Sequence, residues 1–347
     1  MASSQGGDPH IKEALLYEPG RKGRVVCNLC SHRCKVSEGR TGICGVRENR
    51  GGVLYTLVYG LVIAGHVDPI EKKPLFHFAP GSLSMSIATP GCNFRCVFCQ
   101  NWSISQATKK RRPAASGDAI SPEQLVGLAV RQRCKTISYT YTEPTIFFEY
   151  ALETARLASA QNISNVFVTN GYMTAEALDA IYPHLHAANV DLKAFNDRTY
   201  RRKMGATLQP VLNSIKKMKE QGLWLEVTTL VIPTVNDSDG ELRDIAEFIK
   251  SVGPEIPWHI SRFHPDHNLM DLPPTPVAAL ARARDIGLET GLRYVYTGNI
   301  PGDVGEHTFC YSCGAMLIKR FGFQVLDNRI NRGKCPGCGA PIDGVML

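Results

Sequence analysis

From residue 83 onward, short apolar runs alternate with longer segments in which apolar residues recur every three or four positions. The short runs predict β-strands, and the periodic segments predict α-helices. Predicted strands cover residues 83–88, 136–141, 165–169, 189–193, 223–232, 258–262 and 293–297, and predicted helices cover 121–133, 144–160, 174–184, 208–220, 239–253 and 275–291. This alternation predicts parallel strands joined by right-handed crossovers.

The first 80 residues follow a different pattern. Residues 51–81 alternate apolar and polar side chains in places, which predicts short strands. The proline-bounded stretch 68–78 is expected to lie across one end of the strand–helix domain. We therefore predict an N-terminal cysteine-rich module with strands at 1–80, a core domain at 81–300 and a C-terminal cysteine-rich module at 301–347.

The composition is that of a globular protein, with 347 residues, 44% of them hydrophobic and 20% charged. The net charge of +7 is a modest basic excess that could favour an acidic partner or nucleic acid, but it is far from a polybasic tail, so a nucleic-acid partner is not our leading expectation. The most apolar stretch, 54–67, is too short to span a membrane. The polar start at residues 1–7 lacks the apolar core of a secretory signal, so we expect a cytoplasmic protein without membrane association.

Eleven of the twelve cysteines fall in three tight groups, which is the spacing of metal ligands. The central group, Cys92, Cys96 and Cys99, reads C-x3-C-x2-C. A loop with this spacing can offer one thiolate to each of three irons of a cubane cluster, which leaves the fourth iron open for chemistry. The alternatives are a structural zinc site and a plain ferredoxin-like loop, but zinc requires four ligands and the next cysteine is Cys134.

The central motif resembles that of the radical S-adenosylmethionine (SAM) superfamily. Phe98, just before the third cysteine, and the apolar run 83–88 before the loop fit the same pattern. The resemblance implies a [4Fe–4S] cluster whose open iron chelates SAM, and a one-electron cleavage that yields a 5'-deoxyadenosyl radical. It also implies a partial (β/α)6 barrel rather than a flat sheet, with the chemistry at the carboxyl ends of the strands.

Several strand ends carry candidates for SAM binding. Glu143 stands where the family has Gly-Gly-Glu-Pro, with Tyr141 and Thr142 in place of the glycines. Asp191 and Lys193 resemble the Asp-x-Lys of glycyl-radical-enzyme activases, in which both side chains lie near SAM. The cofactor-binding candidates are Phe98, Glu143, Thr169, Asn170, Asp191 and Lys193. The alternatives are a carboxylate at a helix N-terminus for Glu143 and a buried salt bridge for the Asp–Lys pair.

No motif identifies catalytic residues. His259 and Arg262, on the sixth predicted strand of the core domain, are the candidates. A histidine there could gate protons or bind substrate. The alternative for His259 is a hydrogen-bonded core residue.

Two further cysteine groups flank the core. In the N-terminal group, zinc and a second iron–sulfur cluster both fit the spacing, and zinc is slightly favoured. The C-terminal group forms paired CxxC turns, typical of a zinc ribbon or a rubredoxin-like module that binds zinc or one iron. Gly314 and Gly339 follow second cysteines, where positive φ suits the turn. The ligands are Cys27, Cys30, Cys34 and Cys44 in the first group, and Cys310, Cys313, Cys335 and Cys338 in the second.

The whole arrangement resembles the radical SAM enzymes of the AmmeMemoRadiSam system, also labelled pyruvate formate-lyase activating enzyme homologues. The resemblance spans roughly residues 11–346 and rests on the N-terminal cysteines, segments 68–74, 91–102, 141–144 and 191–193, and the C-terminal turns. It implies AMMECR-type and Memo-like partner proteins. We also expect a flavodoxin- or ferredoxin-like reductant.

The leading hypothesis is an enzyme that cleaves SAM reductively and abstracts a hydrogen atom from an unknown small-molecule or protein substrate, as in glycyl-radical activation. One alternative is radical modification of tRNA, suggested by the basic balance and the C-terminal module. Another is a non-catalytic metal-binding scaffold of a multi-protein system. The scaffold predicts no SAM binding and no effect of replacing Cys92, Cys96 or Cys99.

Overall fold

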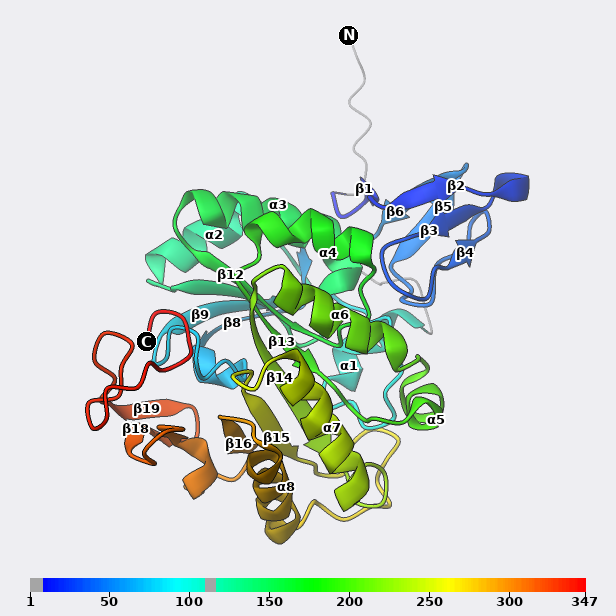
Figure 1. Ribbon diagram of the computed structural model, residues 1–347. Helices are drawn as coiled ribbons and strands as arrows, with labels where there is room; N and C mark the ends of the chain where they lie inside the picture. The colour runs from blue at the N-terminus through cyan, green and yellow to red at the C-terminus, as the bar shows by residue number, and fades with distance from the viewer. Residues whose placement is uncertain (1–8, 110–116) are drawn as a thin grey trace.

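The computed structural model describes residues 9–109 and 117–347, so the polar start at 1–7 lies outside the described residues. Within them, eight strands form one curved sheet in the order β16-β15-β14-β13-β12-β11-β9-β8 (Figure 1). β8 and β16 are its two edges, so the sheet is a partial barrel, as predicted. No described helix combines the length and apolar character needed to cross a membrane.

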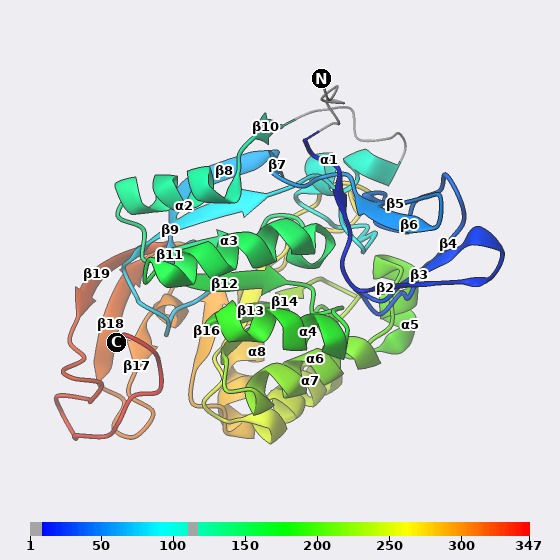
Figure 2. The same cartoon turned by 90° about the horizontal axis from the view of Figure 1, so that it is seen from above.

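Strands and helices alternate through the core as the apolar periodicity predicts. The parallel strands are β9 (Leu83–Ala88), β11 (Thr136–Tyr139), β12 (Ser164–Thr169), β13 (Ala187–Asp191), β14 (Trp224–Val231), β15 (Trp258–Arg262) and β16 (Val295–Gly298). The connecting helices are α2 (Pro122–Arg131), α3 (Phe148–Ala160), α4 (Ala175–Ile181), α6 (Gln209–Glu220), α7 (Asp239–Val252) and α8 (Val277–Thr290). They cover the outer face of the sheet (Figure 2).

Helix α2 illustrates how the sequence fixes an element locally. The Ser121 hydroxyl accepts a hydrogen bond from the Gln124 backbone N–H, and the Gln124 side chain accepts one from the Ser121 N–H. This reciprocal cap satisfies two donors that a helix N-terminus otherwise leaves unpaired. Leu125 and Ala129, one turn apart, are buried against the sheet.

Shorter elements complete the core. α1 (Trp102–Ser105) and η3 (Ala107–Lys109) follow the central cysteine loop, and η4 (Pro144–Phe147) precedes α3. η5 (Tyr182–His184) follows α4, and α5 (Asp197–Thr199) runs into the π-helical η6 (Tyr200–Met204).

The N-terminal residues form two small antiparallel sheets beside the barrel. Their strands are β1 (Lys12–Glu13), β2 (Tyr17–Pro19), β3 (Val25–Cys27), β4 (Lys35–Val36), β5 (Arg47–Arg50) and β6 (Val53–Thr56), with η1 (Arg21–Gly23) between β2 and β3. β7 (Leu61–Val62) pairs with β10 (Asp118–Ala119). β8 (Ala64–Pro69) precedes the boundary predicted at residue 80, yet it pairs antiparallel with β9 in the central sheet.

Residues 70–82, here called the plug segment, cross the amino-terminal end of the barrel and begin with η2 (Ile70–Lys72). The carboxylate of Glu226 in β14 accepts hydrogen bonds from the backbone N–H groups of Phe76 and His77, at 3.0 and 2.9 Å. The Asn189 side chain in β13 donates to the Pro74 carbonyl at 2.7 Å. These buried polar side chains hold the plug inside the strands.

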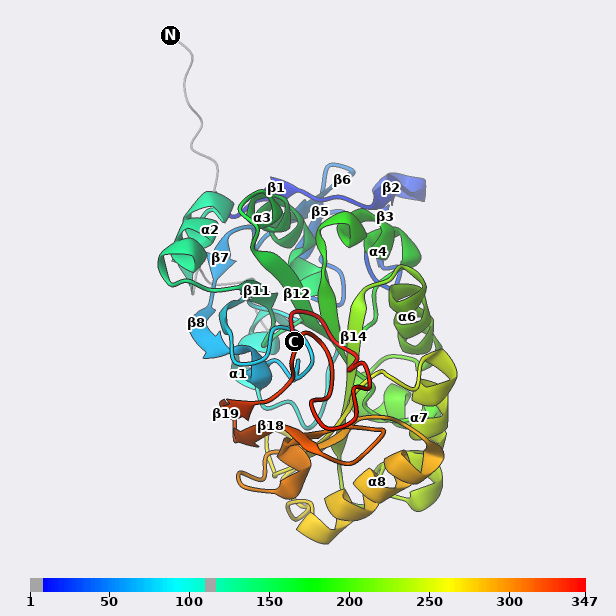
Figure 3. The same ribbon diagram turned by 60° about the vertical axis from the view of Figure 1, so that its left-hand side comes forward.

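The C-terminal module packs against the plug. It contains η7 (Val304–Glu306), β17 (Thr308–Phe309), β18 (Met316–Phe321) and β19 (Gln324–Asn328). Arg320 of β18 donates to the Phe76 carbonyl at 2.9 Å. His77 contacts the Asp343 carbonyl through Nδ1 at 2.6 Å. The final residues overlie the centre of the curved sheet in Figure 3, and Figure 1 places this module far from the N-terminal strands.

Candidate functional site

A pocket of about 410 Å³ opens where the carboxyl ends of the parallel strands meet the central cysteine loop. All the residues predicted to bind the central cluster and SAM line it, although they come from four separate segments. They are Cys92, Cys96, Phe98, Cys99, Glu143, Thr169, Asn170, Asp191 and Lys193. The structure therefore brings the predicted site residues together, while their individual roles stay predictions.

The backbone of the cysteine loop is held by neighbouring segments. Arg95 N–H donates to the Met204 carbonyl at 2.8 Å, and Val97 N–H donates to the Lys203 carbonyl at 3.0 Å, both in η6. The Val97 carbonyl accepts from Asn268 N–H at 2.9 Å. These bonds fix where the three thiols point.

The spacing of the three central sulfurs fits a cluster rather than one ion. Among the described residues, the Sγ atoms of Cys92, Cys96 and Cys99 do not all lie within 4.8 Å of one another. Four thiolates that bind one zinc ion sit at the corners of a tetrahedron, and with a Zn–S bond of ~2.3 Å their sulfurs are ~3.8 Å apart. Ligands on three different irons of a cubane stand farther apart.

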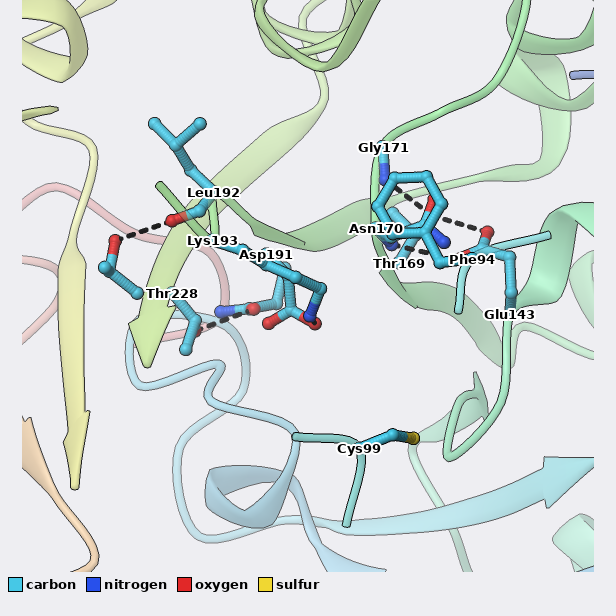
Figure 4. A network of polar contacts seen from close by, with 12 residues as sticks. Phe94, Cys99, Glu143, Thr169, Asn170, Gly171, Asp191, Leu192, Lys193 and Thr228 are labelled. Carbon is cyan, nitrogen blue, oxygen red and sulfur yellow. Dashed lines mark hydrogen bonds and ion pairs between the residues drawn. The ribbon is translucent and has the colours of Figure 1, made fainter. Parts of the chain in front are cut away.

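On one side of the pocket, Glu143 joins the ends of β11 and β12 (Figure 4). Its carboxylate accepts from Thr169 Oγ1 at 2.7 Å, Asn170 N–H at 2.8 Å and Thr145 N–H at 3.0 Å. Burial raises the pKa of Glu143, although these donors oppose the shift. Glu143 is thus the N-cap of η4, as its alternative interpretation requires, and it also lines the pocket.

On the other side, Lys193 Nζ pairs with the Asp191 carboxylate at 2.7 Å (Figure 4). Burial disfavours the charge on Lys193, but Asp191 and then Cys96 raise its pKa above the ordinary value. The pair forms a salt bridge, but it is partly exposed rather than buried as the alternative interpretation predicts, since the Lys193 and Asp191 side chains are 16% and 33% exposed. Because it faces the pocket, it also gives this wall a fixed cation.

Sequence reasoning missed a third group in the pocket. The plug carries Lys73 to the floor, where its ammonium pairs with Asp68 at 2.7 Å and lies 4.5 Å above the ring centre of Tyr141. The Tyr141 hydroxyl donates to the same Asp68 carboxylate. Burial lowers the pKa of Lys73 to about 8, against the effect of Asp68. The available signal was a run of charges between two prolines, at residues 68–74.

The structure does not bring His259 or Arg262 to the pocket. His259 shares the inward face of β15 with Ser261, which does line the pocket, but it lies two residues deeper. There His259 Nε2 bonds the buried Glu226 carboxylate at 2.6 Å, as a hydrogen-bonded core histidine does. Arg262 is on the opposite face, and its Nε donates to the Thr275 carbonyl at 2.8 Å.

The four C-terminal cysteines form a compact group. All four Sγ atoms lie within 4.8 Å of one another, and the Cys310–Cys338 and Cys313–Cys335 pairs are each 3.7 Å apart. Gly314 and Gly339 have φ values of 74° and 76°, in the left-handed region that the turns were expected to need. These distances match tetrahedral thiolates around a single metal ion.

Residues 86–249 match the Radical SAM superfamily. The chain is also 44% identical, over 339 residues, to an uncharacterized protein of Methanocaldococcus jannaschii, a match that covers 97% of this chain and 100% of that protein. The chain belongs to the radical SAM superfamily. It is therefore an enzyme, and its family implies a [4Fe–4S] cluster and SAM.

More distant relatives of this radical SAM enzyme include activating enzymes. It is 22% identical to a pyruvate formate-lyase-activating enzyme of Clostridium pasteurianum over 200 residues, which is 55% of this chain and 79% of that protein. The crystal structure of a radical SAM methyltransferase from Sphaerobacter thermophilus shares the fold, with a TM-score of 0.50 and 17% identity over 66% of this chain and 71% of that chain.

Proposed function

We propose that this enzyme cleaves SAM reductively and abstracts a hydrogen atom from its substrate, in the manner of a glycyl-radical activase. The observation that carries the proposal is the convergence of the three cysteines, Glu143 and the Asp191–Lys193 pair on one pocket. The relative named as a pyruvate formate-lyase-activating enzyme supports the activase class. The substrate, a protein or a small molecule, stays open.

Each wall of the pocket has a separate task in this proposal. Cys92, Cys96 and Cys99 hold the [4Fe–4S] cluster, which when bound supplies the electron that splits SAM into methionine and a 5'-deoxyadenosyl radical. Glu143, whose carboxylate is fixed by β12, accepts from the SAM ammonium group. Lys193, held by Asp191, offers a cation to an anionic or hydroxyl oxygen of SAM.

The plug gives this site a floor of its own. Lys73 and Tyr141 both line the pocket, and Asp68 binds both side chains. We assign this floor to substrate rather than SAM, because the family-like SAM residues occupy the walls.

The deciding experiment measures 5'-deoxyadenosine from anaerobically reconstituted protein with SAM and a strong reductant. Wild type is expected to form it, and the Cys92→Ala, Cys96→Ala and Cys99→Ala variants are expected to form none. Cys134→Ala, outside the three metal-ligand groups, is the matched control and should retain activity. No product from wild type with iron confirmed at the central site would overturn the proposal and favour a metal-binding scaffold.

We further propose that the C-terminal group binds one structural zinc ion. The 3.7 Å sulfur contacts support a single tetrahedral ion, and one iron would give the same spacing. Metal analysis separates the two: purified protein should contain about one zinc per chain that Cys313→Ser removes. A visible absorption band of iron–thiolate that disappears in Cys313→Ser would show iron instead.

The wider setting is proposed from the sequence resemblance. We place the enzyme in the AmmeMemoRadiSam system, in the cytoplasm, with AMMECR-type and Memo-like proteins as partners and a flavodoxin- or ferredoxin-like electron donor. Co-purification of the tagged enzyme with each partner, expressed together under anaerobic conditions, tests the assembly. Elution of all three as separate species would contradict it.

A further inference from the structure

The four N-terminal cysteines surround a space that differs from the C-terminal site. Cys27, Cys30, Cys34 and Cys44 all line one small cavity beside the barrel. Among the described residues, no three of their sulfurs lie within 4.8 Å of one another, whereas the four C-terminal sulfurs all do. The N-terminal sulfurs therefore face a common space without the close contacts that one tetrahedral ion requires.

The central site of the same chain supplies a reference for this spacing. Cys92, Cys96 and Cys99, which the family assigns to a [4Fe–4S] cluster, also fail to bring their sulfurs within 4.8 Å of one another. In a cubane each thiolate binds a different iron at a different corner, so the sulfurs are held apart by the cluster itself. By this internal comparison the N-terminal group resembles the cluster site, not the single-ion site.

A buried cation lines the same cavity. Arg47 is 2% exposed, and its Nη2 donates to Glu149 at 2.7 Å and to the Leu15 carbonyl at 2.6 Å. Its Nε and Nη1 are buried without a hydrogen-bond partner among the described residues. Unsatisfied buried guanidinium donors are costly unless a ligand accepts from them. A cluster ligated by four thiolates is net negative and presents sulfur acceptors to these donors.

The backbone of Gly42 lies close to two of the sulfurs. A Cβ at Gly42 would lie 3.6 Å from Cys34 Sγ and 3.9 Å from Cys44 Sγ. Any longer side chain at this position would therefore fill the space between two of the sulfurs.

The N-terminal cysteine loop packs directly on the central one. His32, between Cys30 and Cys34, contacts the carbonyl of Asn93 through Nε2 at 2.9 Å, and Asn93 adjoins Cys92. The Cys44 carbonyl accepts from Thr108 Oγ1 at 2.8 Å. Gly91 has a φ of 107°, and a Cβ atom added at Gly91 would lie 2.8 Å from the Val46 side chain. Two metal-ligand loops thus meet through hydrogen bonds and close backbone contact.

We infer that Cys27, Cys30, Cys34 and Cys44 bind a second [4Fe–4S] cluster, and that this cluster passes electrons to the central one. One electron leaves a donor of the flavodoxin or ferredoxin class, reduces the N-terminal cluster and moves on to the central cluster, so that only the donor is oxidised overall. The cluster assignment stands on the geometry alone, whereas the relay rests on the proposed reductive cleavage of SAM.

Iron and sulfide analysis tests the cluster assignment. Anaerobically reconstituted wild type should hold about eight irons per chain, and the triple variant Cys92→Ser/Cys96→Ser/Cys99→Ser should retain about four, because each [4Fe–4S] cluster holds four. The reduced triple variant should also give the electron paramagnetic resonance signal of a [4Fe–4S] cluster that SAM leaves unchanged. Loss of all iron from the triple variant, with a second zinc ion retained per chain, would overturn the assignment.

Variants of the N-terminal group provide the reciprocal measurement. Cys27→Ser/Cys30→Ser should retain about four irons and a signal that SAM perturbs, while Cys134→Ser, outside the three groups, should match wild type. If the double variant fails to fold, the iron content of the central triple variant still decides the assignment.

The relay is tested by the choice of reductant. With a flavodoxin-class donor, Cys27→Ser/Cys30→Ser should form 5'-deoxyadenosine at least tenfold more slowly than wild type, and with dithionite it should approach the wild-type rate. If the variant and wild type formed 5'-deoxyadenosine at equal rates with the flavodoxin-class donor as well as with dithionite, the relay would be overturned. A wild type that forms no product with either reductant but holds both clusters would instead reject the proposed function and leave the cluster assignment intact.

Discussion

Tyr141 has a left-handed backbone, with φ of 60°, at a position where the resembling family motif has glycine. A non-glycine residue in this conformation costs on the order of 1 kcal/mol, and such strain clusters at functional sites. The sequence revealed the replacement of glycine by tyrosine, but not its purpose. The structure supplies a reason: the Tyr141 hydroxyl reaches Asp68, which also binds Lys73. Glycine would leave Asp68 without this donor.

Lys73 should make stability depend on pH. Its folded-state pKa is about 8, below the ordinary 10.5. Between these values the unfolded chain binds more protons than the folded chain, so this group's contribution to stability rises with pH. From below pH 8 to above pH 10.5, the free energy of unfolding of wild type should rise relative to Lys73→Met by roughly 3 kcal/mol, at ~1.36 kcal/mol per pKa unit.

Denaturant unfolding at a series of pH values measures this difference. Lys72→Met is the matched control, because Lys72 pairs with the same Asp68 carboxylate but its side chain is 42% exposed. The free energy of unfolding of Lys72→Met should depend on pH in nearly the same way as that of wild type. If the free energy of unfolding of Lys73→Met also had the same pH dependence as that of wild type, burial would not lower the pKa of Lys73.

Glu143→Gln should damage both stability and SAM cleavage. An amide nitrogen cannot accept a hydrogen bond, so at least one buried donor among Thr145, Thr169 and Asn170 loses its acceptor. The expected loss in free energy of unfolding is roughly 1–3 kcal/mol, and 5'-deoxyadenosine formation should fall at least tenfold. Glu176→Gln, which breaks an exposed ion pair with Arg33, should change stability by no more than ~0.5 kcal/mol. Equal behaviour of the two variants would contradict the assignment.

At the scale of elements, the sequence predicted the parallel strands of the core and the helices that connect them, because each follows from local pattern. The cap of α2 and the apolar runs of β9 and β15 are encoded within a few residues. The positions of the plug and the C-terminal module are not local. Arg320 meets the Phe76 carbonyl across 244 residues of chain, and no periodicity encodes such a contact. His259 was a candidate for the pocket, with a hydrogen-bonded core residue as the alternative; alternation along a strand indicates which face a residue occupies but not its depth in a barrel, and His259 lies deeper, against Glu226.

Arg320 should be the main link between the C-terminal module and the plug. It is 1% exposed, donates to the Phe76 carbonyl and Thr308 Oγ1, and lies 3.7 Å from the buried Glu71 carboxylate. Arg320→Met leaves Glu71 without its counter-charge, so the free energy of unfolding should fall by about 3 kcal/mol. Arg329→Met, which removes an exposed ion pair with Asp327, is the control and should change it by no more than ~0.5 kcal/mol. Denaturant unfolding of both variants measures the difference, and similar midpoints would contradict the link.

At the scale of the whole molecule, the two flanking cysteine groups serve opposite ends of the barrel. The N-terminal group packs on the central cysteine loop at the carboxyl ends of the strands. The C-terminal group folds a module that holds the plug from the amino ends, and the plug carries Lys73 into the pocket. The proposed zinc ion is therefore connected to the substrate side of the pocket, and not to the cysteine loop.

This connection predicts where the molecule loosens when the C-terminal metal is lost. In Cys313→Ser, the Arg320–Phe76 and His77–Asp343 contacts should weaken, because the turns that position β18 and the final residues lose their shared ligand. Amide hydrogen exchange should then accelerate at least tenfold in the plug segment, while exchange in the loop 92–99, held by η6, should stay unchanged. Ser312→Ala, at an exposed position of the same turn, should leave both segments as in wild type. Faster amide exchange in the cysteine loop but not in the plug would contradict this assignment. It would mean that the C-terminal module supports the cluster and not the floor of the pocket.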